Sequence, residues 1–295
     1  MISKYKHKKL TWIDLESPTR EEVLDITERY DLPELVADEL LRKTLRSKVD
    51  MYPNVIYLIL HFPSTGHKHG KESHMEIDFI IGKNFLITAH YELVDPLHEF
   101  AKDFEVNAIL QKSDIGNHAG FLFFHIIKKL YLYSAEQLED IQLHLERVEK
   151  NIFDGHEKEM VNEISKINRK LLDFKQTIRF HREILASFEI AAKKFFNKAF
   201  GYNLSILSGE FNKVENLVDS HKELLNDLRD TNDSLLADKT NETMRTLTIM
   251  SIAFFTLTLI AAVFSMDTIY KPIVGVKGDF WMIIGIMILA IFGLY

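Results

Sequence analysis

The sequence of 295 residues contains no cysteine, so disulfide bonds and thiolate metal ligands are excluded. It also lacks a phosphate-binding glycine loop and a nucleophile elbow, and we therefore expect neither ATP-driven pumping nor an enzyme. The net charge of −7 argues against nucleic acid as the main partner. No apolar signal core follows the basic N-terminus, so we expect the N-terminal part to stay in the cytoplasm.

Charged residues are almost absent from the last fifty positions, and this absence is the most informative one. Residues 246–266 form a run of 21 without a charge, which is long enough for a helix to cross a bilayer. A short polar hinge ends this run at residues 265–267, and a second apolar run occupies residues 280–295. The pattern predicts a membrane hairpin that returns the chain to the cytoplasmic side.

The preceding chain shows strand signals first and helix signals later. Ser17-Pro18 indicates the start of a helix, with Ser17 as its N-cap. Residues 120–235 contain no proline, and their periodicity predicts long helices that break near Gly155 and Gly201. Four short apolar runs predict strands at residues 12–15, 55–60, 77–81 and 85–88, the last two forming a hairpin around residues 82–84.

The last cytoplasmic helix carries mostly apolar residues at steps of three and four, which is the spacing of a packed seam. No glycine or proline interrupts residues 210–267, so one helix about 85 Å long, at ~1.5 Å per residue, can run from cytoplasm into membrane. The seam comprises Val214, Val218, His221, Leu225, Leu228, Asn232 and Leu235.

A second stripe steps along the same helix and continues through the apolar run. Its first members are acidic, and its members in the apolar run are mostly small or hydroxylated. Several copies around an axis would line a narrow path with these side chains. The alternative is that the stripe packs one helix against another, since small residues are normal at such interfaces. The stripe comprises Glu223, Asp227, Asp230, Ser234, Ala237, Asn241, Met244, Thr248, Ser251, Phe255, Thr258, Ala262 and Ser265.

Two parts of this stripe have expected roles in ion passage. Rings of Glu223, Asp227 and Asp230 would concentrate cations at a cytoplasmic mouth, although the acids equally suit an ordinary solvated face. Met244 and its neighbour Leu247 are bulky and apolar, and they suit a constriction that closes by dewetting.

Several segments resemble the CorA family of divalent-cation transporters. They are residues 241–249 (NETMRTLTI), 257–261 (LTLIA), 35–40 (LVADEL), 46–50 (RSKVD) and 80–86 (IIGKNFL). The resemblance covers nearly the whole chain and preserves the order of its elements. It implies an α+β cytoplasmic domain with α/β/α layers, long stalk helices and two transmembrane helices, assembled as a funnel-shaped homopentamer.

The resemblance also implies the division of the chain and the roles of its pore residues. Asn241 is expected at the cytoplasmic end of the pore, Met244 and Leu247 in the gate, and Thr258 in the outer half. Family members finish with a basic tail, which this sequence lacks, so we expect the second transmembrane helix to be incomplete here. The expected parts are the α/β domain at 1–118, antiparallel helices at 119–200, the stalk helix at 201–243, transmembrane helix 1 at 244–266, an extracytoplasmic loop at 267–279 and transmembrane helix 2 at 280–295.

The hinge departs from the family signature Gly-Met-Asn and reads Ser265-Met266-Asp267. In the family, a ring of asparagine carbonyls meets a hydrated magnesium ion, which sheds its water reluctantly. A ring of Asp267 carboxylates would bind a cation more strongly and slow its release. We expect these three residues to form the selectivity filter, with Asp267 as a transient metal ligand.

We therefore expect transport of divalent cations, most of all magnesium and also cobalt or nickel, through a pentameric pore lined by transmembrane helix 1 in the inner or plasma membrane. The alternatives are a transporter of zinc or another transition metal, and a non-conducting membrane scaffold. No tightly bound cofactor is expected beyond a transported or regulatory divalent cation. The partners are the bilayer and further copies of the chain. His67, His69 and His74 are weaker candidates for a transition-metal site, since imidazole suits zinc and nickel.

Overall fold

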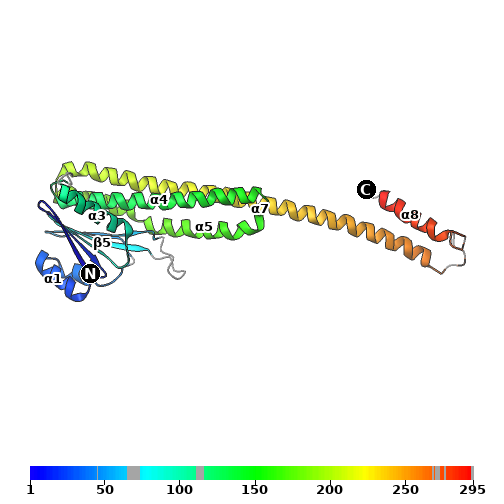
Figure 1. Cartoon of the computed structure of the whole chain (residues 1–295), viewed down its shortest axis with the longest axis horizontal. Coiled ribbons are helices and arrows are strands. Elements are labelled where there is room, and N and C mark those ends of the chain that lie inside the picture. The colour runs from blue at the N-terminus through cyan, green and yellow to red at the C-terminus, as the bar shows by residue number, and fades with distance from the viewer. Residues whose placement is uncertain are drawn as a thin grey trace. The chain divides into compact units, whose positions relative to one another are not determined.

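The computed structural model describes residues 1–44, 46–64, 74–110, 116–267, 269, 273–275 and 277–293. The chain divides into two compact units, residues 1–229 and residues 230–295. The long helix α7 (Gly201–Ser265) contributes to both units. The first unit holds a sheet and a helical bundle, and the second holds the apolar end of α7 and the helix α8 (Asp279–Gly293) (Figure 1).

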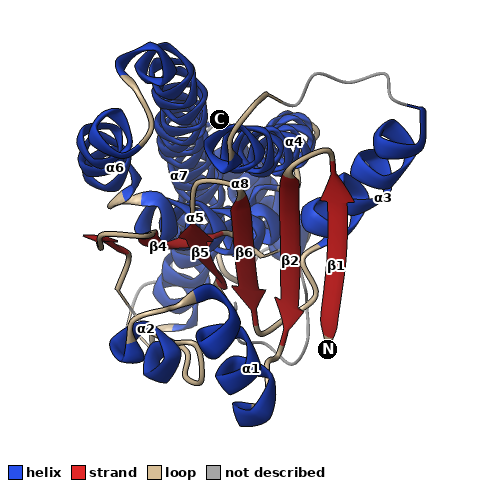
Figure 2. Cartoon of the chain, turned by 90° about the vertical axis from the view of Figure 1, so that its left-hand side faces the viewer, coloured by secondary structure: helices blue, strands red, loops and turns tan. Residues whose placement is uncertain are grey.

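One six-stranded sheet, with the strand order β1-β2-β6-β5-β4-β3, forms the centre of the first unit (Figure 2). β2 and β6 run parallel, and the other neighbours run antiparallel. The four strands predicted from apolar runs are present, whereas the edge strands β1 and β3 were not predicted. The strands are β1 (Ile2–His7), β2 (Leu10–Glu16), β3 (Lys48–Met51), β4 (Ile56–Phe62), β5 (Met75–Ile81) and β6 (Phe85–His90).

Two short helices, α1 (Arg20–Tyr30) and α2 (Glu34–Glu39), cover one face of the sheet. Their buried residues share a core with alternate strand residues such as Ile59 and Ile80. A capping box starts α1, because the Thr19 hydroxyl accepts from the Glu22 N–H at 3.3 Å and the Glu22 carboxylate accepts from the Thr19 N–H at 2.9 Å. The predicted N-cap at Ser17 was therefore wrong.

The opposite face of the sheet packs against α4 (Ala119–Phe153) and α6 (His181–Phe195). The Phe79 ring of β5 lies 5.2 Å from the Phe123 ring of α4, which lies 4.5 Å from the Phe188 ring of α6. The helix α3 (Asp95–Leu110) covers Trp12 with the ring of Phe100. Helices on both faces of a mixed sheet confirm the expected α/β/α layers.

The bundle helices begin and end largely where glycine signals were read. α4 ends at Phe153, and Gly155, with a φ of +91°, leads into α5 (Glu157–Ile178). The short helix η1 (Lys198–Phe200) precedes the start of α7 at Gly201. The break between α5 and α6 at residues 179–180 was not predicted, because neither glycine nor proline marks it.

The predicted seam of α7 is confirmed by burial. Val214, Val218 and Leu225 are each 1% exposed. The polar members His221 and Asn232 are buried as well, and Leu235 is half-buried. An ion pair of 2.6 Å between Lys175 of α5 and Asp219 holds α7 beside α5.

Candidate functional site

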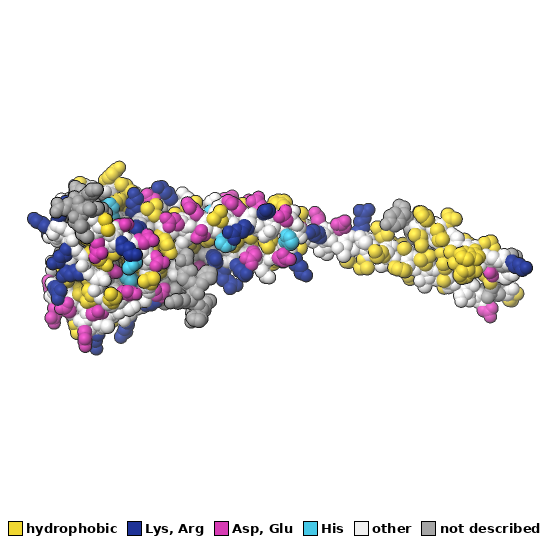
Figure 3. Space-filling view, in the orientation of Figure 1, with side chains coloured by type: hydrophobic (Ala, Val, Ile, Leu, Met, Phe, Trp, Pro, Cys, Tyr) yellow, Lys and Arg dark blue, Asp and Glu magenta, His cyan; other side chains and the backbone are white. Residues whose placement is uncertain are grey.

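The apolar part of α7 has no fully buried side chain among the described residues. Every side chain from residue 237 to residue 252 is exposed, and the most hydrophobic stretch is 0% buried. By length and composition this helix can cross a membrane, and α8 is a shorter apolar helix. Figure 3 shows the hydrophobic side chains gathered over this end of the chain, where charges are few. These surfaces require lipid or other protein as their surroundings.

The partly buried residues of α7 after residue 252, and those of α8 after its first residue, form one stripe on each helix. On both helices they recur at steps of three and four, as expected of helices that turn one face toward each other. The predicted stripe, represented by Thr248, Ser251 and Thr258, remains exposed and lies apart from these faces. The partly buried residues are Ala253, Thr256, Leu257, Ile260 and Phe264 of α7, and Ile283, Ile284, Met287, Ala290 and Ile291 of α8.

Three exposed hydroxyls of the stripe donate back into the helix. The donor–acceptor distances are 2.7 Å from Thr248 to the Met244 carbonyl, 2.8 Å from Ser251 to the Leu247 carbonyl and 2.8 Å from Thr258 to the Phe254 carbonyl. Because each hydroxyl hydrogen is used in this way, the oxygen keeps its lone pairs for an outside donor. The helix surface therefore offers hydrogen-bond acceptors, which suit the water shell of a cation.

The predicted gate residues lie on the same exposed surface. Met244 and Leu247 are each 57% exposed, and Phe255 is 76% exposed. The acids Glu223, Asp227 and Asp230 are exposed earlier on α7, and Asn241 is exposed between the two groups. Each of these side chains is accessible to solvent, to lipid or to another copy of the chain.

The hinge follows directly on the end of α7. The helix ends at Ser265, the Met266 N–H donates to the Val263 carbonyl at 3.3 Å, and Asp267 is exposed beyond the helix. Asp279 starts α8 and accepts from the Gly275 N–H at 3.0 Å, where Gly275 has a φ of +101°. Residues 270–272 lie outside the described residues. The filter role of the hinge stays a prediction.

Only one of the three histidine candidates lies within the described part of the chain, so the proposed transition-metal site stays a prediction. His67 and His69 lie outside that part. His74 is bonded through Nδ1 to the Thr177 hydroxyl at 2.6 Å, and burial lowers its pKa. Among the described residues no group of three or more potential metal ligands occurs.

A buried acidic pair on β5 was missed by the sequence reasoning. Glu76 is 5% exposed, and Asp78 has no exposed surface. The signal was two carboxylates spaced two residues apart in an otherwise apolar strand, which places both on one face of the sheet. The pair lies in the first unit and far along the sequence from the stripe of α7.

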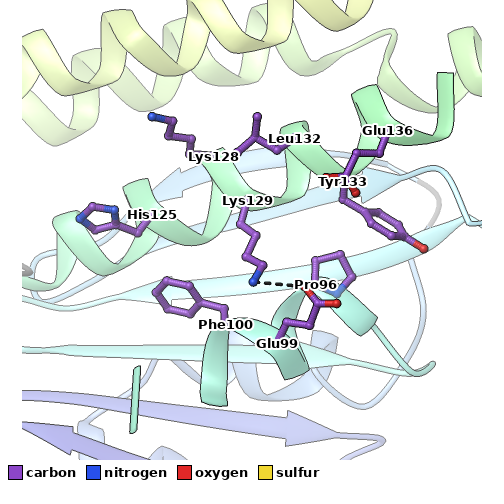
Figure 4. Close-up of a pocket in the computed structure, with 9 residues that line it drawn as sticks. All are labelled: Pro96, Glu99, Phe100, His125, Lys128, Lys129, Leu132, Tyr133 and Glu136. Carbon is purple, nitrogen blue, oxygen red and sulfur yellow. Dashed lines mark ion pairs between the residues drawn. The ribbon is translucent and has the colours of Figure 1, made fainter. Parts of the chain in front are cut away.

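A pocket of about 370 Å³ opens between α3 and α4 (Figure 4). Phe100, Leu132 and Tyr133 contribute its apolar wall. Its central cation, Lys129, already pairs with Glu99 at 3.2 Å and Asp103 at 3.2 Å. Because these two carboxylates balance the charge of Lys129, we assign this pocket no role in cation passage.

An α/β/α domain joined to one long helix, which ends in an apolar hairpin, defines the fold class of the CorA transporters. The CorA magnesium transporter from Methanocaldococcus jannaschii matches with a TM-score of 0.83 at 19% identity, over 98% of this chain and 90% of that structure. The full-length CmaX protein matches with a TM-score of 0.74 at 14% identity, over 97% and 87%. The ZntB cytoplasmic domain from Vibrio parahaemolyticus matches with a TM-score of 0.65 at 13% identity, over 78% and 89%.

The family model of the CorA-like Mg²⁺ transporter proteins matches residues 7–295, and the chain belongs to this family. The cobalt/magnesium transport protein CorA of Thermotoga maritima is 24% identical, over 94% of this chain and 78% of that protein. The putative metal ion transporter YfjQ of Bacillus subtilis is 23% identical, over 96% of this chain and 86% of that protein. The family resemblance stated from the sequence is confirmed, and so is the expected fold of the single chain, while the homopentamer stays a prediction.

Proposed function

We propose that this chain assembles as a homopentameric, channel-like pore that passes divalent cations across a cell membrane, with α7 lining the pore. The observation that carries the proposal is the exposed stripe of hydroxyl oxygens on the apolar part of α7. Magnesium is the first ion to consider, with cobalt and nickel next, because the relatives are named for magnesium and cobalt transport.

Several copies are required by the chemistry of the stripe. A single helix gains nothing by presenting Thr248, Ser251 and Thr258 to lipid, where no donor reaches their oxygens. Copies around an axis turn the same oxygens toward a water-filled path. The partly buried faces of α7 and α8 leave this stripe available for such an axis.

The order of the side chains on α7 suits the stages of ion passage. Glu223, Asp227 and Asp230 raise the local cation concentration through their charge. Rings of Met244 and Leu247 close the path by dewetting, since a hydrated magnesium ion does not readily shed its water. Beyond that gate, the hydroxyl oxygens accept hydrogen bonds from the water shell and let the ion move on.

Asp267 is the residue on which the choice of ion depends. A carboxylate ring binds a divalent cation more tightly than neutral amide oxygens do, and tight binding slows release. Under this proposal Asp267 reduces magnesium flux relative to asparagine. The same tight binding favours the second candidate function, transport of zinc or another transition metal. The N-terminal unit is cytoplasmic in both cases, and no tightly bound cofactor takes part.

The test is ion flux through the purified full chain in liposomes, measured separately for magnesium, zinc, cobalt and nickel. We expect magnesium flux in the wild type and a severalfold increase in Asp267→Asn. Asp233→Asn is the matched control, because Asp233 is exposed on α7 outside the stripe. Flux of zinc alone would favour the second candidate. Silence of folded wild type and Asp267→Asn for all four ions would favour the scaffold alternative.

A further inference from the structure

We propose that Asp78, in the core beneath α1 and α2, binds a proton at neutral pH and forms a proton-sensing site that controls how α2 and the chain after it attach to the sheet. The site lies wholly in the first unit and is independent of the proposed pore. Its ligand is the hydrogen ion, and its output is the release of the α2–β3 connection when that ion leaves.

The surroundings of Asp78 do not suit an ionised carboxylate. Its side chain has no exposed surface, and Oδ2 accepts a single hydrogen bond, from the Tyr57 hydroxyl at 3.0 Å. Oδ1 is buried without a hydrogen-bond partner among the described residues. The residue directly opposite on β4 is the apolar Ile59. A carboxylate with one donor in such a site costs several kcal/mol, so it takes up a proton instead.

The neighbouring Glu76 has better hydrogen-bonding surroundings than Asp78. Its two oxygens accept from the Thr44 N–H at 2.9 and 2.7 Å, and the Thr44 hydroxyl adds a further bond at 3.2 Å. His61 lies 3.6 Å from Glu76, while its ring is held by the Thr44 carbonyl at 2.9 Å and the Ser47 hydroxyl at 3.0 Å. Glu76 therefore has donors that Asp78 lacks, and its negative charge repels a second one beside it.

The positively charged side chain of this region, Lys48, pairs with acids other than Asp78. Lys48 of β3 places its Nζ 2.6 Å from Glu39 of α2 and 2.7 Å from Asp50 of β3. Glu39 also adds negative charge that raises the pKa of Asp78, whereas Lys48 lowers it only in part. α1 faces the same core with the apolar Val23. Burial first, and the Glu76 charge second, hold the pKa of Asp78 well above its ordinary range.

The remaining titratable groups at this end of the sheet belong to the segment after β6. The Tyr91 hydroxyl lies 3.4, 3.1 and 3.3 Å from the carbonyl oxygens of Glu39, Leu40 and Arg42. Glu92 pairs with Lys43 of the α2–β3 connection at 2.6 Å. The end of α2 and the connection are thus held by Glu76, His61, Tyr91 and Glu92. Asp78 lies two residues from Glu76 on the same face of β5.

Loss of the Asp78 proton therefore acts on the connection. It would create a second buried negative charge next to Glu76. Detachment of the connection would admit water, and the water would stabilise both charges. A carboxyl group with a raised pKa in the fold stabilises the fold at low pH, and this contribution is lost as the pH rises through the raised value. We expect α2 and Thr44 to loosen on the alkaline side while the rest of the sheet stays intact.

The test uses the full chain in detergent micelles. Infrared difference spectra between wild type and Asp78→Asn at pH 7 should show the carbonyl stretch of a protonated carboxylic acid in the wild type only. Asp50→Asn, which removes an acid of the same region that pairs with Lys48, should leave that band in place. Amide hydrogen exchange corrected for its intrinsic pH dependence should show protection of residues 34–44 falling about tenfold per pH unit above the transition in wild type. Asp78→Asn should show no such fall.

Glu76→Gln provides a second variant in case Asp78→Asn does not fold. Without the neighbouring charge, Asp78 ionises more easily. The infrared band of its protonated form should therefore disappear at a lower pH in Glu76→Gln than in the wild type. Absence of a protonated band in the wild type at pH 7 would overturn the proposal. Equal alkaline loosening in wild type and Asp78→Asn would overturn it as well, since the transition would then belong to another group.

Discussion

Phe79 of β5 has no exposed surface, whereas Phe255 of α7 is 76% exposed, although both are phenylalanines in regular structure. The first unit covers its sheet with its own helices on both faces. In the second unit, α8 has no buried residue at all within its described length. The first unit therefore gains its stability from its own core, whereas the described helices of the second unit bury little of their apolar surface within the chain.

The largest expected effect comes from the same change, phenylalanine to alanine, made once in each unit, and it tests whether the two units are stabilised differently. Phe79→Ala should destabilise the first unit by about 3–5 kcal/mol, because it opens a cavity between the Phe123 ring and the sheet. Phe255→Ala should leave the unfolding of the first unit unchanged and alter cation flux instead. Chemical unfolding of the full chain in detergent, followed by near-ultraviolet circular dichroism, measures the first effect. Equal destabilisation by both changes would contradict the division of the chain.

The second prediction concerns the stability of the fold at low pH. It distinguishes the two units because a buried histidine lies in the first unit. His181 is fully buried, its Nε2–H donates to the His61 carbonyl at 2.8 Å, and its Nδ1 accepts from the Tyr131 hydroxyl at 2.9 Å. Burial lowers the pKa of His181 to about 4. The folded state thus binds fewer protons than the unfolded state between pH 6.5 and 4, so stability is complete above this window and is lost as the pH falls through it.

The expected loss is about 3 kcal/mol across the window, at ~1.4 kcal/mol per pKa unit. Thermal unfolding of the full chain at pH 7, 6, 5 and 4 measures it. His144→Gln, at an exposed position of α4, should follow the wild type, whereas His181→Asn should start lower and depend less on pH. Residues 230–295 contain no histidine, so the second unit should not respond in this window. A wild-type curve that is flat from pH 7 to pH 4 would contradict the assignment.

The central strands and long helices could be predicted because their patterns are repetitive and self-consistent. β4 and β5 consist mostly of apolar residues, and the seam of α7 repeats Val214, Val218 and Leu225 at helical spacing. β1 was missed because an edge strand alternates exposed polar residues such as Lys4 and Lys6, which look like a loop in the sequence. The start of α1 was misplaced by two residues, since both Ser17 and Thr19 are good N-caps.

Only the positions of the candidate site residues along the helix could be predicted from the sequence, and not their contacts. Periodicity identified the stripe of α7 from Thr248 to Thr258, because a helix repeats regardless of what surrounds it. Periodicity could not show that these hydroxyls donate their hydrogens to backbone carbonyls of the helix. Because of those bonds, the hydroxyl oxygens face outside groups as acceptors. Asp78 was overlooked because burial of a carboxylate depends on which helix covers the strand, and that is a tertiary property.

The smallest expected effect sharpens the comparison at the junction of the units. Asp227 and Asp230 belong to the stripe, and Asp233 is equally exposed on α7 but lies off it. If copies of α7 surround an axis, Asp230→Asn should reduce cation flux at low ionic strength by about twofold, since the neighbouring rings remain. The reduction should vanish at high salt, where exposed charges more than ~3 Å apart are screened. Asp233→Asn should have a smaller effect, because Asp233 lies beside the stripe and is not one of its members. Equal reductions by both variants would mean that net charge, rather than a ring, attracts the ion, and the acids would then be the solvated face that the spacing also allows.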